Sequence, residues 1–106
     1  MNNSIQIDNQ SVTVYLVYEH LGAYYCVPKS LVTKVKQSVL DLADSAPKGK
    51  PLTLKQHFGT KSWNGINGGH PVLAGYAMAH LVAKHLVPFK AMGIDPNSKA
   101  QMYALI

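Results

Sequence analysis

The residues with the clearest potential for chemistry lie in a glycine- and asparagine-rich segment that leads directly into an apolar helix. The segment, Lys61 to Pro71, contains Ser62-Trp63-Asn64-Gly65-Ile66-Asn67-Gly68-Gly69-His70. Glycine and asparagine tolerate positive φ angles, so we expect a loop whose free N–H groups and following helix dipole face an anion. The same composition also suits a turn that only redirects the chain. The candidate ligand-binding residues of this loop are Lys61, Trp63, Asn64, Asn67, Gly68, Gly69 and His70.

A second pattern lies on the apolar helix that follows. Tyr76, His80 and Lys84 are spaced four residues apart and therefore align along one stripe of a helix. Beneath a Trp63 loop, this stripe would offer a hydroxyl, an imidazole and a cation to an anionic ligand. The alternative is that it forms the solvent-facing edge of a mostly buried helix.

The positive charge of the chain is concentrated between positions 29 and 61. The net charge of +5 comes from ten lysines without any arginine, and seven of the lysines fall between positions 29 and 61, against Asp41 and Asp44. This balance favours an acidic partner, either a protein surface or a nucleic-acid backbone. The absence of arginine argues against sequence-specific reading of duplex DNA. The alternative is that the lysines serve only to keep the surface soluble. The predicted basic patch consists of Lys34, Lys36, Lys48, Lys50 and Lys55.

Catalysis has weaker support than binding. Cys26 with His57, or the stripe of Tyr76, His80 and Lys84, would supply the reactive groups of a small hydrolase-type enzyme. The alternation of apolar residues around Cys26 favours instead a small buried thiol. The chain has only five carboxylates and lacks the Gly-x-Ser-x-Gly motif, so we predict no catalytic residues.

Neither a metal nor a cofactor is expected. His80 and His85 lie about 140° apart on a helix and cannot share a metal ion. Gly65-x-x-Gly68-Gly69 matches neither the dinucleotide fingerprint nor a Walker loop.

The length of 106 residues, with 47% apolar and 14% charged side chains, predicts a single domain spanning residues 1–106. We predict an α+β fold, with a small N-terminal antiparallel β-meander of two or three strands packed against three or four helices. The strands fall at 5–7, 11–19 and 23–27, with turns at 8–10 and 20–22. A helix capped by Ser30 extends to about residue 44. Its predicted buried face consists of Leu31, Val32, Val35, Val39, Leu40, Leu42 and Ala43.

The C-terminal half is expected to be helical. Thr53 caps a short helix that ends at Gly59, and a second helix runs from Pro71 to about Val87 at the centre of the fold. Asp95 and Pro96 then begin a final helix through Leu105. The turn before it, 91–96, is also compatible with a helix-turn-helix.

These features favour a small non-catalytic binding or regulatory module that contacts an acidic partner. An inhibitor or regulator such as mobile elements encode is an alternative, and homodimerisation is a further one. The chain shows no secretory signal and no membrane span, and Cys26 is its single cysteine, so a cytoplasmic location is expected.

Overall fold

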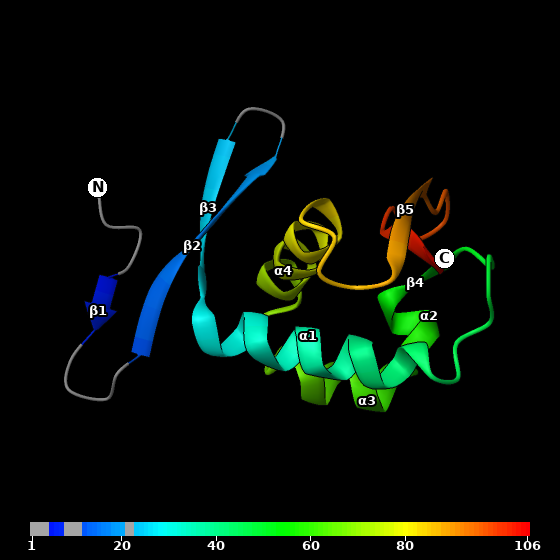
Figure 1. Cartoon of the computed structure of the whole chain (residues 1–106), viewed down its shortest axis with the longest axis horizontal. Helices are drawn as coiled ribbons and strands as arrows, with labels where there is room; N and C mark the ends of the chain where they lie inside the picture. The colour runs from blue at the N-terminus through cyan, green and yellow to red at the C-terminus, as the bar shows by residue number, and fades with distance from the viewer. Residues whose placement is uncertain (1–4, 8–11, 21–22) are drawn as a thin grey trace.

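The computed structural model describes residues 5–7, 12–20 and 23–106. Three strands, β1 (Ile5–Ile7), β2 (Val12–His20) and β3 (Ala23–Pro28), form an antiparallel sheet in the order β1-β2-β3. In the register of the sheet, Ile5 of β1 lies opposite Val14 of β2, and Tyr18 of β2 lies opposite Tyr25 of β3. The described residues also contain four helices, so the predicted α+β fold with an N-terminal meander is confirmed (Figure 1). The turns predicted at 8–10 and 20–22 lie outside the described residues, apart from His20.

Helix α1 (Lys29–Ala43) follows the meander without a break. It buries Val32, Val35 and Val39, and Leu31, Leu42 and Ala43 are partly buried against the core. The predicted apolar face is therefore confirmed except at Leu40, which is 37% exposed. The predicted cap at Ser30 is wrong, because the helix already begins at Lys29 with Pro28 in the capping position. Pro28 has no side-chain acceptor, and the helix begins without a side-chain capping hydrogen bond.

The short helix α2 (Leu54–Phe58) begins as the sequence predicts. The Thr53 hydroxyl accepts a hydrogen bond from the Gln56 N–H at 3.2 Å, and the Gln56 side chain accepts one from the Thr53 N–H at 2.9 Å. This reciprocal pair satisfies two N–H groups at the start of the helix. Gly59 ends the helix with a φ of 86°, a conformation that favours glycine.

The loop predicted for residues 61–70 is wrong, because most of it forms helix α3 (Thr60–Asn67). Trp63 and Asn67 are buried on its inner side, and Ile66 packs against the core. Burial of this face outweighs the low helix propensity of Gly65 and of the two asparagines. Only Gly68 to His70 connect α3 to the next helix.

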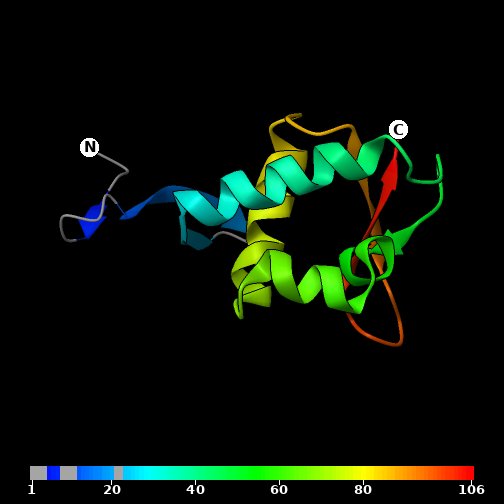
Figure 2. The same ribbon diagram turned by 90° about the horizontal axis from the view of Figure 1, so that it is seen from below.

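Helix α4 (Pro71–Ala83) lies at the centre of the fold. Pro71 occupies its first turn as predicted, and Ala74, Ala77, Met78 and Leu81 are buried. The helix packs against α1, α3, the two strands β2 and β3, and the C-terminal sheet. Figure 2 shows α1 and α3 side by side, with α4 crossing them at one end and the C-terminal sheet at the other.

Helix α4 ends earlier than the predicted Val87. The N–H groups of His85 and Leu86 donate to the carbonyls of Val82 at 3.1 Å and Leu81 at 2.9 Å, the two bonds of a Schellman motif. His85 takes the left-handed conformation that this motif requires, with a φ of 57°. The chain therefore turns away before Pro88 is reached.

The predicted C-terminal helix is also wrong, because strands β5 (Phe89–Ile94) and β6 (Gln101–Leu105) form a hairpin there. Strand β4 (Leu52–Thr53) joins it in the order β4-β6-β5. The Asp95 carboxylate accepts bonds from the N–H groups of Asn97 and Ser98 and from the Ser98 hydroxyl, and the last of these is the main reason its pKa is lowered. Asp95 thus stabilises a turn rather than a helix start, which rules out the helix-turn-helix considered for this region.

Candidate functional site

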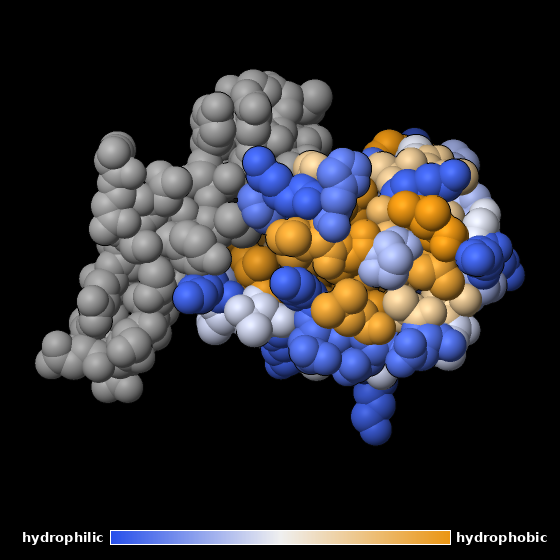
Figure 3. All heavy atoms as spheres, viewed as in Figure 1, coloured by the Kyte–Doolittle hydropathy of each residue, from blue (hydrophilic) through white to orange (hydrophobic). Residues whose placement is uncertain are grey.

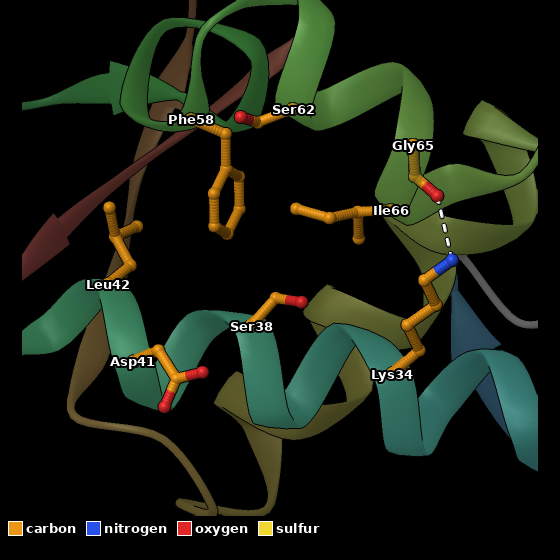
Figure 4. A pocket seen from close by; sticks show the side chains of 8 residues that line it. All are labelled: Lys34, Ser38, Asp41, Leu42, Phe58, Ser62, Gly65 and Ile66. Atoms are coloured by element: carbon orange, nitrogen blue, oxygen red, sulfur yellow. Dashed lines mark hydrogen bonds between the residues drawn. The ribbon is translucent and has the colours of Figure 1, made fainter.

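An open groove of about 570 Å³ lies between α1 and α3. Its walls combine apolar side chains with hydroxyls and one charge of each sign, and they come from three helices (Figure 4). The lining residues are Lys34, Ser38, Asp41 and Leu42 of α1, Phe58 of α2, and Ser62, Gly65 and Ile66 of α3.

One end of the groove is closed by a contact between its two walls. The Nζ of Lys34 donates a hydrogen bond to the carbonyl oxygen of Gly65 at 2.8 Å. Two further ammonium protons of Lys34 remain for other acceptors. Toward the other end, Asp41 accepts a bond from the Gln37 side-chain amide at 3.2 Å, which leaves acceptor positions on its carboxylate.

An aromatic pair supports the groove. Phe58 and Trp63 stack with ring centroids 6.2 Å apart and an angle of 9° between their planes. Trp63 is 8% exposed and belongs to the core, whereas Phe58 is half-buried and projects between α3 and α1 (Figure 4). The indole therefore holds the phenyl ring in place at the groove.

One lysine lines the groove, and two more lie on the helices that form it without lining it. Lys34 lines it, Lys55 is three residues from Phe58 on α2, and Lys61 is four residues from Gly65 on α3. Residues at these spacings are neighbours on a helix surface. All three lysines are exposed, and none is ion-paired with a carboxylate of the described residues.

The other lysines of the predicted basic patch lie elsewhere on the fold. Lys36 is half-buried on α1, and Lys48 and Lys50 are exposed in the segment before β4. The backbone of Lys48 forms an isolated parallel β-bridge with Leu105 of β6. These three do not line the groove.

The predicted anion-binding loop has a different geometry. The N–H groups of Gly68, Gly69 and His70 already donate to Asn64 O, Asn67 Oδ1 and Asn67 O at 3.2, 2.9 and 2.9 Å. They are therefore not the free donors that the sequence predicted. Lys61, Asn64, Gly68, Gly69 and His70 are exposed, while Trp63 and Asn67 are buried. Whether the exposed residues contact a partner remains a prediction.

The stripe on α4 does not line the groove. Tyr76 and His80 are half-buried, and Lys84 is exposed just beyond the end of the helix. Burial lowers the pKa of His80, and the charge of Lys84 lowers it further. Neutral His80 beside a lysine is consistent with the edge of a packed helix as well as with a ligand contact.

Cys26 and His57 have separate structural surroundings. Cys26 is exposed on β3, so the predicted buried thiol is wrong. His57 bonds through Nε2 to the carbonyl of Tyr103 at 2.8 Å and packs edge-on against Phe89, while its Nδ1 is buried without a partner. Among the described residues, no three His, Cys, Asp or Glu side chains are placed to hold a metal ion.

The surface in Figure 3 has apolar side chains over the centre of the helical part, surrounded by hydrophilic ones. The large apolar residues most exposed are Val72, Ile106, Ile94, Leu86, Met92 and Leu40. Trp63 is not among them, because only 8% of it is exposed. Within the described ranges, no helix is long and apolar enough to cross a membrane.

Lys34 was predicted as part of the basic patch, whereas the other residues that line the groove were not predicted as site residues. Lys34, Ser38 and Asp41 have the spacing of one helix face, which was visible in the sequence. The opposite wall was not visible, because Ser62, Gly65 and Ile66 were assigned to a loop. Comparison with protein families, with curated proteins and with solved structures finds no match for this chain.

Proposed function

We propose that this chain is a non-catalytic binding module that holds the phosphate backbone of a nucleic acid through Lys34, Lys55 and Lys61. The observation that carries the proposal is that exposed Lys34 lines the groove, while exposed Lys55 and Lys61 each lie within one helical turn of a residue that lines it. Ammonium groups attract phosphates without reading sequence, and each contact releases condensed counterions.

The remaining composition supports backbone contact over base-specific contact. The chain has no arginine, the side chain that makes bidentate contacts to guanine. Among the described residues, the groove lining contains one lysine, Lys34, and one carboxylate, Asp41, and the further positive charge comes from Lys55 and Lys61 on the adjoining helices. Binding through these lysines is expected to be weakly selective among sequences and strongly dependent on salt.

The test is a matched pair of double variants, measured by fluorescence anisotropy with a labelled single strand of about 20 nucleotides. Lys55→Gln/Lys61→Gln removes two charges beside the groove, and Lys90→Gln/Lys99→Gln removes two charges from the β5–β6 hairpin. We expect the first variant to bind several-fold more weakly and the second to bind nearly as the wild type does. Equal losses in both variants would show that only net charge matters. Salt-sensitive binding of a Glu-rich peptide, with no nucleic acid bound, would assign the lysines to an acidic protein and overturn the proposal.

A further inference from the structure

Resting on this proposed function, we infer that the α1–α3 groove receives an unpaired base of a single-stranded nucleic acid. Phe58 would stack on the base, Lys34 would contact a flanking phosphate, and Asp41 would accept a hydrogen bond from an exocyclic amino group. The groove thus adds a contact to bases that the surface lysines alone do not provide.

The aromatic ring is the first support. Stacking on aromatic side chains is the main way in which proteins hold single strands without reading their sequence. Phe58 projects into the space between α3 and α1 (Figure 4), and its parallel packing on Trp63 fixes the ring. Leu42 and Ile66 give the rest of the groove an apolar lining that suits a planar base.

The order of polar groups along α1 is the second support. Lys34, Ser38 and Asp41 follow one another at four and three residues, and the stripe spans roughly 10 Å of helix. A cation stands at one end, a hydroxyl in the middle and a carboxylate at the other end. The carboxylate repels phosphate, so the charges orient a nucleotide with its phosphate at Lys34 and its base edge at Asp41.

The Lys34–Gly65 contact supplies the third support. The bond of 2.8 Å, although exposed to solvent, places the ammonium group at the end of the groove. A lysine held in place loses less conformational entropy when a phosphate binds. Bases within a duplex are paired and stacked, so only unpaired nucleotides can present a base to this groove.

The experiment compares three labelled nucleic acids of equal length: a single strand, a strand of abasic residues, and a duplex. The abasic strand keeps every phosphate and removes every base. We expect the wild type to bind the normal strand roughly tenfold more tightly than the abasic strand. Equal affinities for these two strands would overturn the groove inference, while salt-sensitive binding of both would leave the proposed function standing. Failure to bind any of the three would overturn both.

Variants locate the effect at the groove. Ser62 is exposed and lines the groove, so Ser62→Leu fills it without disturbing the core, and Thr33→Leu places the same side chain on an exposed position of α1 outside it. Ser62→Leu is expected to bind the normal and abasic strands equally, and Thr33→Leu to keep the tenfold preference. Persistence of the preference in Ser62→Leu would contradict a base in this groove.

Asp41→Asn tests the orientation of the base. Cytosine has an exocyclic amino donor, and thymine has a carbonyl acceptor in its place. The wild type is expected to prefer oligo-dC over oligo-dT, and the ratio should fall to about one in Asp41→Asn. An unchanged ratio would contradict the placement of the base edge at Asp41.

Discussion

Lys34 on α1 and Gly65 on α3 are joined by a hydrogen bond of 2.8 Å between the lysine Nζ and the glycine carbonyl oxygen. This bond connects two residues that are 31 positions apart in the sequence and lie on different helices. It closes one end of the candidate binding groove. The same lysine thus contributes to helix packing and to the charge of the surface. Its two roles can be separated experimentally.

Replacing Lys34 by methionine keeps the length of the apolar stem and removes the donor and the charge. Because the bond is exposed, we expect the free energy of unfolding to fall by no more than about 1 kcal/mol, measured by urea denaturation. Nucleic-acid binding should weaken severalfold in the same variant. Lys36→Met is the control on the same helix, and an equal loss of binding there would contradict a specific role for Lys34.

Gly75 lies inside α4, and a Cβ added there would meet no atom within 4 Å. Gly75→Ala should therefore raise the free energy of unfolding by about 0.5 to 1 kcal/mol, because alanine loses less backbone entropy in a helix. Gly68→Ala should lower it, since Gly68 has a φ of 58°. Urea denaturation of both variants provides the comparison, and a loss of stability in Gly75→Ala would show that α4 is packed more tightly than described.

His80 makes stability depend on pH. Burial and the charge of Lys84 lower its pKa in the folded state below the ordinary value of 6.5. The unfolded chain therefore binds the proton more readily, so this stabilisation is present above pH 6.5 and is lost as pH falls through the lowered folded pKa. We expect His80→Gln to flatten the fall in unfolding free energy on acidification from about pH 7.5 to 5.5.

Lys84→Gln provides a second test of the same effect. It removes the charge that helps to lower the His80 pKa, while His80 itself remains. The slope of stability against pH should then lie between those of the wild type and His80→Gln. Identical slopes in all three proteins would mean that His80 has the same proton affinity in the folded and unfolded states.

The Thr53 hydroxyl caps α2, and Thr53 is buried, so removing the hydroxyl should lower the free energy of unfolding. Thr53→Ala leaves the Gln56 N–H without its acceptor and is expected to cost about 1 kcal/mol of unfolding free energy. Thr60→Ala is the matched control, because Thr60 is exposed and Gly59, not Thr60, occupies the capping position of α3. Thermal unfolding of the two variants should separate them, and equal melting temperatures would argue against the capping box.

The elements predicted correctly are those whose signals are local. The buried stripe of Val32, Val35 and Val39, the Thr53 cap and the first-turn Pro71 each depend on residues within one helix or beside it. Such patterns need no knowledge of the partner element. The alternation that predicted β2 has the same local character.

The errors fall where tertiary packing decides the conformation. Trp63, Ile66 and Asn67 have the spacing of a helix face, but the glycine and asparagines among them favoured a loop. The C-terminal hairpin pairs β5 with β6, which are close in sequence, but Asp95 and Pro96 in its turn are residue types that also begin helices. The pairing of β6 with β4, whose residues lie about fifty positions away, leaves no local signal. The groove could not be predicted because one of its walls is the helix that was missed.

The dependence of nucleic-acid affinity on salt tests the central claim most directly. The association constant of the wild-type chain for a labelled single strand should be measured between about 50 and 200 mM salt. With Lys34, Lys55 and Lys61 each neutralising one phosphate, the logarithm of the constant should fall with the logarithm of salt at a slope of about −2. A slope near zero, or no binding at the lowest salt, would contradict the account.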